Sequence, residues 1–301
     1  MENVAARRTR PEGLQQVPPG ALLALGVGAA SFSPILLRVA EGAAPLALSF
    51  WRCLAGTVLL LPFARRQLRF LSPTSIAVCA ISGAFLALHF ASWITSLELT
   101  TVASSVLLVS TTPIFVALVA PIVVKERLAV AGWAGITIAM IGTALLTGVD
   151  AGEATLSGNL LALLGGATAG GYVLAGRSAR QTVGIFAYAV VTYGVAAAVL
   201  LAACLGRGVA LAGYDAGTWW AIAAVVIGPQ LLGHTVINLV LSRIDATTVS
   251  VSLMAEPVVA TALAALLFDE IPSLLIYPAA AAIFAGIYMV SSADRPEPTP
   301  T

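Results

Sequence analysis

The sequence is poor in charged residues. Only 10% of its 301 residues are charged, whereas 59% are hydrophobic, and an average soluble domain carries roughly 25% charged residues. The formal net charge of +1 offers no basic surface on which a nucleic acid would be held. The composition therefore argues against an ordinary soluble domain and against a nucleic-acid partner.

Cysteine and histidine are also scarce, and neither is arranged for metal binding. Cys53, Cys79 and Cys204 all lie inside apolar runs, where free cysteine packs as a small hydrophobe. His89 and His234 each lack a neighbour at the spacing of a zinc-binding helix. The pattern GxxxxGK(S/T) of a nucleotide-binding loop is absent as well. We therefore predict no metal and no cofactor, and we expect any energy for work to come from a gradient.

Long apolar runs dominate what is present. A helix needs about 20 apolar residues to cross the hydrocarbon core of a bilayer, and ten such runs follow one another with short connections. They cover residues 18–40, 43–64, 74–96, 101–123, 128–148, 157–177, 182–205, 217–240, 246–267 and 272–292. The sequence therefore predicts an all-α integral membrane protein, a bundle of ten transmembrane helices in contact with the lipid bilayer.

The basic residues indicate how this bundle is oriented. With a cytoplasmic amino terminus, twelve Lys and Arg residues fall on the cytoplasmic side, and only Arg38 and Arg207 fall on the other side. This asymmetry agrees with the positive-inside rule. Residues 1–17 are then expected to be a retained cytoplasmic leader, and the proline-rich residues 293–301 a disordered cytoplasmic tail.

The chain also contains an internal repeat. At a constant offset of 144, residues 101–148 align with 245–292, Pro113 with Pro257, and Glu126 with Glu270. We predict a first five-helix repeat over 18–148 and a second over 157–292. Because five is odd, two such repeats lie upside down relative to each other, an arrangement that places substrate sites near the midplane between them.

Glu256 is the leading candidate for a functional residue. It lies within the ninth apolar run, directly before Pro257, and a proline there leaves the Leu253 carbonyl without its helical donor. A carboxylate at this depth is expensive and is kept where it has a partner or a task. We predict that Glu256 binds and releases a proton or cation; the alternative is a permanently paired, structural carboxylate. Its repeat mate is Thr112 before Pro113, so we expect kinks at both prolines but a titratable group at one.

Four further polar residues are candidates for substrate binding or coupling: Arg52, His89, His234 and Asn238. Arg52 keeps its charge at ordinary pH, so it needs Glu256, Glu98 or a substrate carboxylate as an anion, unless it snorkels to the membrane interface. Each histidine could titrate near neutral pH or form hydrogen bonds between helices as a neutral ring. Asn238 comes one turn after His234 and could line the same face.

Five aromatic residues could give a small-molecule cavity its apolar lining. They are Phe90, Trp93, Phe115, Tyr188 and Tyr193. The alternative is that these side chains only pack against neighbouring helices or lipid.

Three stretches resemble a known family. LTTVASSVLLVSTTPIFVALVAPIVVKERL (99–128), IDATTVSVSLMAEPVVATALAALLFDEIP (244–272) and SFWRCLAG (49–56) are similar to the EamA-type branch of the drug/metabolite transporter superfamily. The resemblance runs from about residue 20 to residue 292. It implies a ten-helix bacterial exporter of the inner membrane that exports or exchanges small metabolites, amino acids or drugs, with Arg52 in the family's arginine position. No role for Glu126 or Glu270 follows from it.

Together these features predict a secondary active transporter that moves a small metabolite by alternating access, with proton coupling as one option. A facilitator without ion coupling is an alternative. Another is an intramembrane enzyme built on His89, His234 and Glu256, although no GxSxG or HExxH pattern supports it. The expected partners are a small-molecule substrate and lipid, and both a monomer and a homodimer are compatible with the sequence.

Overall fold

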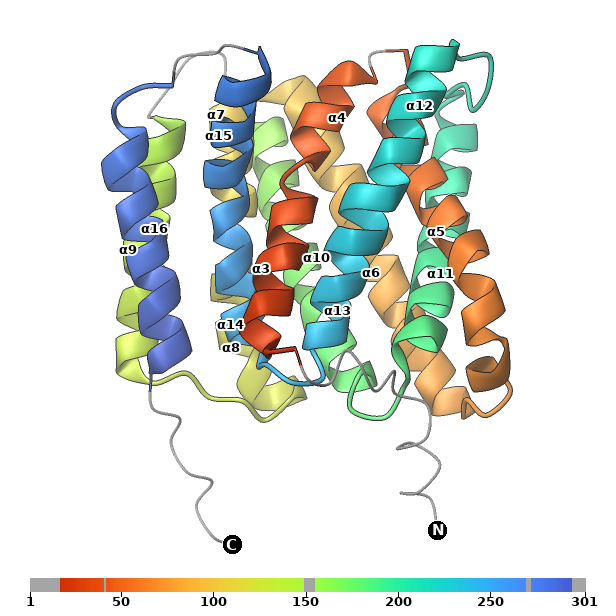
Figure 1. Cartoon of the computed structure of the whole chain (residues 1–301), viewed down its shortest axis with the longest axis horizontal. Helices are drawn as coiled ribbons and strands as arrows, with labels where there is room; N and C mark the ends of the chain where they lie inside the picture. Colours follow the sequence, from red (N-terminus) through yellow and green to blue (C-terminus); the bar gives the residue numbers. More distant parts are fainter. Residues whose placement is uncertain (1–16, 41, 149–154, 269–271, 294–301) are drawn as a thin grey trace, which may run out of the picture.

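The computed structural model describes residues 17–40, 42–148, 155–268 and 272–293, which form a bundle of helices running between two opposite ends (Figure 1). Within the described residues, nine helical segments are long and apolar enough to cross a membrane, and a tenth, Ile276–Ser292, is apolar but shorter. The predicted all-α membrane fold is therefore confirmed. Apart from Val17 and Ala293, the predicted leader and tail lie outside the described residues, as does Glu270.

Each half of the chain supplies five crossings. The first five are α3 (Pro19–Ala30) with α4 (Ser33–Val39), α5 (Pro45–Leu68), α6 (Pro73–Leu99), α7 (Val102–Val109) with α8 (Thr112–Val123), and α9 (Val130–Thr147). The second five are α10 (Leu156–Ala179), α11 (Ile185–Gly206), α12 (Ala216–Val225) with the π-helix η2 (Val226–Thr235) and α13 (Val236–Val240), α14 (Ala246–Ser252) with the 3-10 turn η3 (Leu253–Ala255) and α15 (Glu256–Phe268), and α16 (Ile276–Ser292).

The fourth and ninth crossings begin and break at equivalent positions. Thr101 Oγ1 accepts a hydrogen bond from the Ser104 N–H at 3.1 Å, and Asp245 Oδ1 accepts one from the Thr248 N–H at 2.7 Å. These side chains satisfy amide groups that the first turn of a helix leaves unpaired. Each crossing is then interrupted about one half of the way along, just before a proline.

Two other crossings are interrupted where the sequence predicted continuous helices. The first breaks between α3 and α4, directly before Ser33 and Pro34; the proline nitrogen cannot donate a hydrogen bond to the Ala30 carbonyl. The eighth widens into the π-helix η2, which contains Pro229. Wide turns of this kind occur frequently at functional sites. Prolines thus mark four interruptions, two of which the repeat analysis did not predict.

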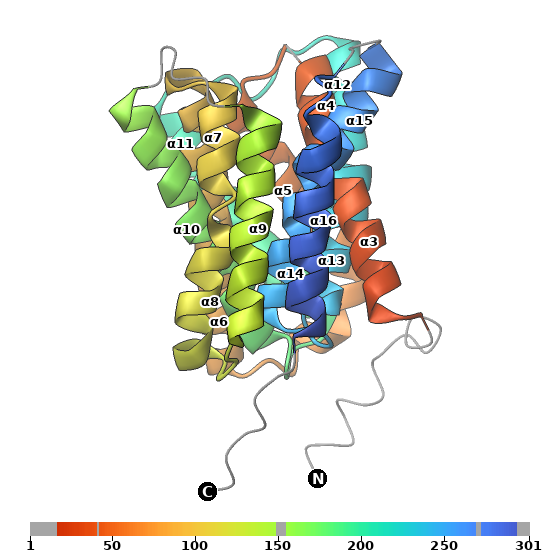
Figure 2. The same cartoon turned by 90° about the vertical axis from the view of Figure 1, so that its left-hand side faces the viewer.

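The main helix pairs join the two halves of the chain. α6 packs against α10, α3 against η2, α5 against α11 and α9 against α16. In an inverted repeat, α6 corresponds to the η2 crossing and α10 to the α3 crossing, so the α6–α10 pair is equivalent to the α3–η2 pair. In the α5–α11 and α9–α16 pairs, the two helices correspond to each other. The packing therefore has the symmetry that the repeat implies. In the α9–α16 pair, seen from its own side in Figure 2, a Cβ at Gly142 would lie 2.7 Å from the Ala279 carbonyl oxygen, so the close contact needs glycine there.

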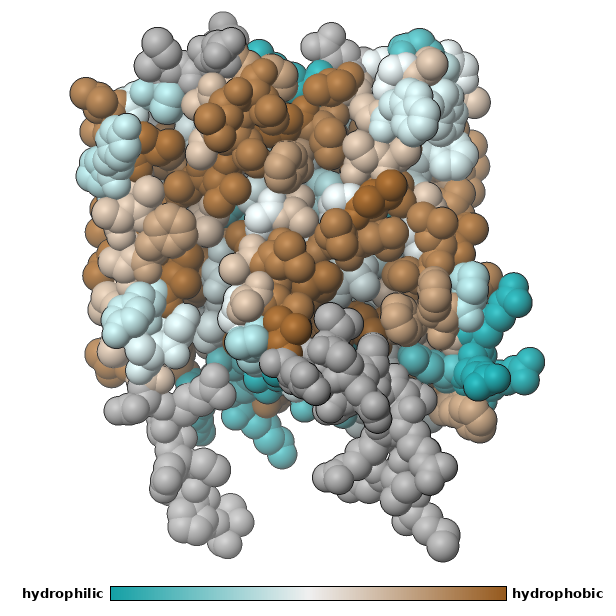
Figure 3. Space-filling view, in the orientation of Figure 1, coloured by the Kyte–Doolittle hydropathy of each residue, from teal (hydrophilic) through white to brown (hydrophobic). Residues whose placement is uncertain are grey.

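The two ends of the bundle differ in what they carry. We call the end where α3 begins and α16 ends the terminal end, and the opposite one the far end (Figure 1). Figure 3 shows a largely hydrophobic band between them, with the strongest hydrophilic patches at the terminal end. There, α5 ends in the exposed Arg65 and Arg66. The hydrophobic band is the surface that a bilayer would cover.

Candidate functional site

Polar side chains from both halves of the chain meet inside the bundle. We call this group the central cluster. Its members are Arg52 of α5, Phe90 of α6, Tyr172 of α10, Tyr193 of α11, Gln230 and His234 of η2, and Asn238 of α13. Because both halves contribute, the cluster lies at the interface between them.

Arg52 is buried, with 3% of its surface exposed. Its Nε donates to Gln230 Oε1 at 2.8 Å, and its Nη1 donates to Ser33 Oγ at 3.3 Å. The guanidinium carbon lies 4.7 Å from the centre of the Phe90 ring, a cation–π contact. Ser33 reaches it because the first crossing breaks directly before that residue. These contacts place the head group of Arg52 inside the bundle and do not fit snorkelling to the interface.

The eighth crossing presents a polar stripe to this cluster. Gln230, His234 and Asn238 follow one another at intervals of four residues and so lie along one face. Gln230 binds Arg52, the His234 ring contacts the ring of Phe90 edge-on at 5.8 Å, and the Asn238 amide nitrogen donates to the Tyr172 hydroxyl at 2.6 Å. Hence His234 and Asn238, which were predicted to share a face, do so.

The tyrosine hydroxyls extend the network. Tyr193 Oη lies 3.0 Å from Thr235 Oγ1 and accepts a longer hydrogen bond, 3.4 Å, from the Asn238 amide nitrogen. Gly56, one turn after Arg52, leaves room for this arrangement, because a Cβ there would lie 3.2 Å from Gln230 Cγ. Tyr193 is therefore a member of the polar network as well as an apolar lining residue.

His89 lies on the edge of this cluster. Its Nδ1 is 2.9 Å from the Gly165 carbonyl oxygen, so this nitrogen carries the proton, and its ring stacks on Trp93 with centroids 5.9 Å apart. A contact of this kind between α6 and α10 is the interhelical role that the sequence analysis held as an alternative to titration.

Glu256 and Thr112 begin equivalent half-helices, but their environments differ. Thr112 Oγ1 lies 2.8 Å from the Val109 carbonyl oxygen, which Pro113 leaves without a donor, and 3.0 Å from that of Gly166. In the other repeat, the Leu253 carbonyl is not free as expected, because the Glu256 N–H donates to it in the 3-10 turn η3. The Glu256 carboxylate therefore has no capping role at its own kink, whereas the Thr112 hydroxyl has one.

Arg52 and Glu256 interact electrostatically without forming an ion pair. Among the described residues, no salt bridge or hydrogen bond joins the two side chains. Glu256, His89 and His234 keep part of their surface accessible, whereas Arg52 and Gln230 are sealed. The exposure of the whole residue thus distinguishes these three titratable residues from Arg52 and Gln230.

The remaining predicted lining residues lie apart from the central cluster. Phe115 of α8 packs against α10: a Cβ added at Gly170 would lie 3.3 Å from the Cβ of Phe115. Tyr188 is fully buried in a separate hydrophobic cluster with Cys79 and Ala179, and its hydroxyl lies 2.7 Å from Ser82 Oγ. Phe115 thus makes a packing contact, and Tyr188 adds a buried hydrogen bond between α11 and α6.

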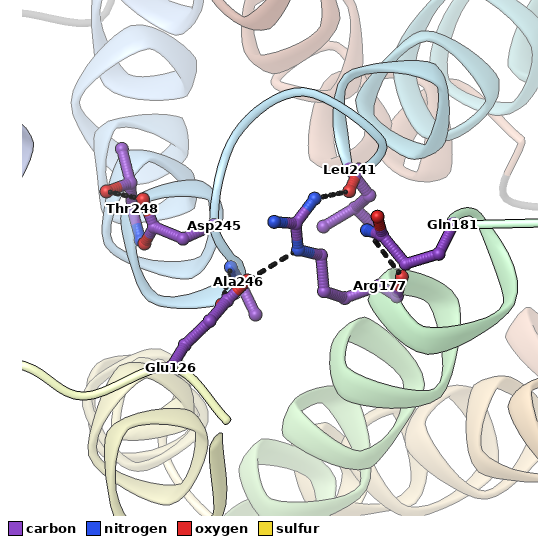
Figure 4. A network of polar contacts seen from close by, with 7 residues as sticks. All are labelled: Glu126, Arg177, Gln181, Leu241, Asp245, Ala246 and Thr248. Atoms are coloured by element: carbon purple, nitrogen blue, oxygen red, sulfur yellow. Dashed lines mark hydrogen bonds and ion pairs between the residues drawn. The ribbon is translucent and has the colours of Figure 1, made fainter. Parts of the chain in front are cut away.

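A second polar network closes the terminal end (Figure 4). Glu126 Oε1 accepts a hydrogen bond from Arg177 Nε at 2.6 Å, and its Oε2 accepts one from the Ala246 N–H, at the start of α14, at 2.9 Å. Arg177 Nη1 donates in turn to the Leu241 carbonyl at 2.6 Å. Lys125, with a φ of 58°, turns the chain so that Glu126 faces this network. We call these contacts the terminal latch; they tie α8, α10, α13 and α14 together.

Sequence reasoning missed several members of both networks. Gln230 and Tyr172 were not singled out, although Gln230 stands four residues before His234 on the same helical face. For Ser33 the signal was weaker: the adjacent Pro34, in an otherwise apolar run, indicates a possible break in the helix at this point. Arg177 looked like one more basic residue at a helix end, and its partner Glu126 is 51 residues away.

Comparison with known proteins places this architecture among transporters. A family model described as "EamA-like transporter family" matches residues 18–148 and 156–292. A protein of Bacillus subtilis (strain 168) described as "Uncharacterized transporter YdfC" is 28% identical over 258 residues, covering 84% of this chain and 83% of that protein. A solved crystal structure superposes with a TM-score of 0.76 at 22% identity, over 90% of this chain and 95% of the other. At that identity the structural likeness concerns the fold alone.

Proposed function

Since the chain belongs to the EamA-like transporter family, we propose that it is a secondary active transporter that exports or exchanges a small metabolite across the inner membrane of a bacterium. The family and the relative named as a transporter support membrane transport of a small substrate, rather than catalysis. The resemblance to the drug/metabolite transporter superfamily found in the sequence is thereby confirmed. Substrate, direction and coupling belong to the proposal.

The central cluster, together with His89 at its edge and Glu256 near Arg52, is the observation that carries this proposal. A buried arginine, two histidines and a carboxylate lie near one another in a bundle that otherwise presents apolar residues to lipid. Charged groups at membrane depth are costly and mark substrate or ion pathways. Helix interruptions beside them, at Ser33, Gln230 and Glu256, supply the irregular backbone that transporters place around their sites.

We further propose that the halves alternate access by exchanging their contacts at the two ends. At the terminal end, α14 packs against α8. The repeat-related helices α7 and α15 lie at the far end and are not among the closely packed pairs of the described residues. This difference supports a conformation closed at the terminal end, with the reverse arrangement as its counterpart.

Substrate flux in proteoliposomes tests the proposed function. Candidate compounds come from a screen for metabolites to which an overexpressing strain becomes resistant. We expect the purified protein to catalyse counterflow of such a compound, which is recovered chemically unchanged, while protein-free liposomes show none. Recovery of a converted product would instead select the intramembrane enzyme.

Topology provides a separate prediction. We propose that both termini are cytoplasmic, because α3 begins and α16 ends at the terminal end, where the basic residues are concentrated. A reporter fused after Ser292 should then be cytoplasmic, and one inserted within residues 150–153, outside the described residues, should be external. Two reporters on the same side would contradict the proposed ten crossings.

A further inference from the structure

Two donors of the central cluster are buried without an acceptor among the described residues. Arg52 Nη2 and Gln230 Nε2 find no hydrogen-bond partner in this part of the chain, although both atoms are sealed from solvent. The two side chains are already joined through Arg52 Nε and Gln230 Oε1 at 2.8 Å. A buried donor left unpaired loses its hydration without compensation, so the pair is primed to bind an acceptor.

Glu256 does not fill that role. It interacts electrostatically with Arg52, but no ion pair or hydrogen bond joins them in the part of the chain that the structure describes. Ser33 Oγ accepts a hydrogen bond from Arg52 Nη1 at 3.3 Å, and the Phe90 ring covers one face of the guanidinium. The unpaired donors are therefore Nη2, on the part of the Arg52 guanidinium that Ser33 does not contact, and the neighbouring Nε2 of the Gln230 amide.

We propose that Arg52 Nη2 and Gln230 Nε2 bind the carboxylate of the transported substrate. This inference rests on the proposed function and names its substrate class: a small carboxylate that carries an apolar or aromatic body. Two N–H donors on adjacent planar groups match the two oxygens of a carboxylate. A single guanidinium with the Glu256 carboxylate nearby suits a monoanion better than a phosphate dianion, because the central cluster has no second Lys or Arg among its members.

The body of the substrate would contact the aromatic members of the cluster. Phe90 lies against both Arg52 and His234, and Tyr172 has its ring 6.2 Å from that of His234. Because the donors are sealed in this conformation, a ligand reaches them only when neighbouring elements move. The long bond to Ser33, at the break between α3 and α4, is the contact on Arg52 that such a movement would release first.

Ligand-observed fluorine NMR on the full-length protein in nanodiscs tests the subsite. The probes are 4-fluorobenzoate and its neutral counterpart 4-fluorobenzamide, which have the same ring and nearly the same shape. We expect the benzoate to bind and the benzamide to bind at least about tenfold more weakly, because it lacks the charge that strengthens hydrogen bonds to Arg52. Arg52→Gln should weaken benzoate binding by a similar factor.

Gln230→Glu provides a second variant that keeps the arginine. Its new carboxylate would neutralise Arg52 internally and remove the Nε2 donor, so benzoate binding should weaken by at least about tenfold, as in Arg52→Gln. Arg66→Gln, which removes an exposed arginine at the end of the same helix, is the matched control and should bind as the wild type does. The Gln230 variant also keeps the test decisive if Arg52→Gln fails to fold.

Equal binding of the two probes, no binding of the benzoate, or benzoate binding that survives both substitutions would overturn the subsite. The assay needs no transport, so its outcome is separate from that of the flux experiment. Flux of neutral or cationic compounds alone would leave the transporter proposal standing and refute the carboxylate subsite. Benzoate binding at Arg52 without flux of any compound would support the subsite and contradict the transporter.

Discussion

Replacing Glu256 with glutamine is expected to abolish accumulation of substrate against its gradient and to leave counterflow exchange largely intact. Glutamine has nearly the same size and mimics the protonated carboxyl, so the half-helix α15 should still begin at this position. What the variant loses is the change of charge between two steps of a cycle. Glu256 is half-buried as a residue and its carboxylate has no capping role at its kink, so a change of its charge would not unpair the backbone there.

The measurement is accumulation in proteoliposomes under an imposed pH gradient, with counterflow measured on the same preparation. Glu256→Asp, which keeps the charge on a shorter side chain, should retain partial activity with an altered pH dependence. Glu98→Gln is the matched control, because Glu98 is an exposed carboxylate at the far end whose ion pair with Arg207 is long, at 3.6 Å. Accumulation by Glu256→Gln with the pH dependence of the wild type would make Glu256 structural and favour a facilitator.

The repeat shows why such coupling would be confined to one half. At the first kink, the hydroxyl of Thr112 is engaged with the carbonyls of Val109 and Gly166. At the second, the backbone N–H of Glu256 donates to the Leu253 carbonyl, so the carboxylate is not needed to cap the break. The scaffold is symmetric in its helices and asymmetric in the chemistry at its two kinks.

The fold was largely predictable from the sequence, because its signals are local. Runs of apolar residues predict crossings by length alone, and the offset of 144 that pairs Pro113 with Pro257 relates the two half-helix breaks. The π-helix η2 was not predictable in this way, since hydropathy does not distinguish one helical pitch from another. The break before Ser33 had a local signal in the sequence, Pro34, but this proline lies inside a run that is apolar on average and was therefore assigned to one continuous helix.

The candidate site was less predictable, because its contacts join residues that are far apart in the sequence. The hydrogen bond between Arg52 and Gln230 spans 178 positions, and that between Tyr172 and Asn238 spans 66. Sequence reasoning listed three possible anions for Arg52 and did not consider a neutral amide. It also could not tell that Tyr188, as apolar and aromatic as Tyr193, lies in another cluster.

Replacing Glu126 with glutamine is expected to loosen the terminal end. Glu126 holds Arg177 at 2.6 Å and the first amide of α14 at 2.9 Å, and both contacts weaken when the acceptor loses its charge. Hydrogen bonds to charged groups contribute roughly 1.5–3 kcal/mol. Since the pair is partly exposed, with side-chain accessibilities of 17% and 20%, we expect the lower end of that range, about 1.5 kcal/mol, which is roughly a tenfold shift toward opening.

Opening can be measured by maleimide labelling of a cysteine introduced at Ser250, which is 1% exposed on α14 below the latch. Labelling should be roughly ten times faster in Glu126→Gln than in the otherwise wild-type background. Gln181→Ala is the control, because the side chain of exposed Gln181, just past the end of α10, donates locally to the Arg177 carbonyl at 3.2 Å (Figure 4). It removes a neighbouring polar side chain without touching the contacts to α14.

The same substitution distinguishes a latch from a merely structural ion pair. If the terminal end opens and closes during transport, Glu126→Gln should raise labelling at Ser250→Cys and slow transport together, because the conformation closed at this end is populated less. A structural pair would instead lower the unfolding temperature and leave the labelling rate of the folded protein unchanged. Arg177→Gln should have the smaller effect, since Glu126 would keep its bond to the Ala246 N–H and α14 would stay tied to α8.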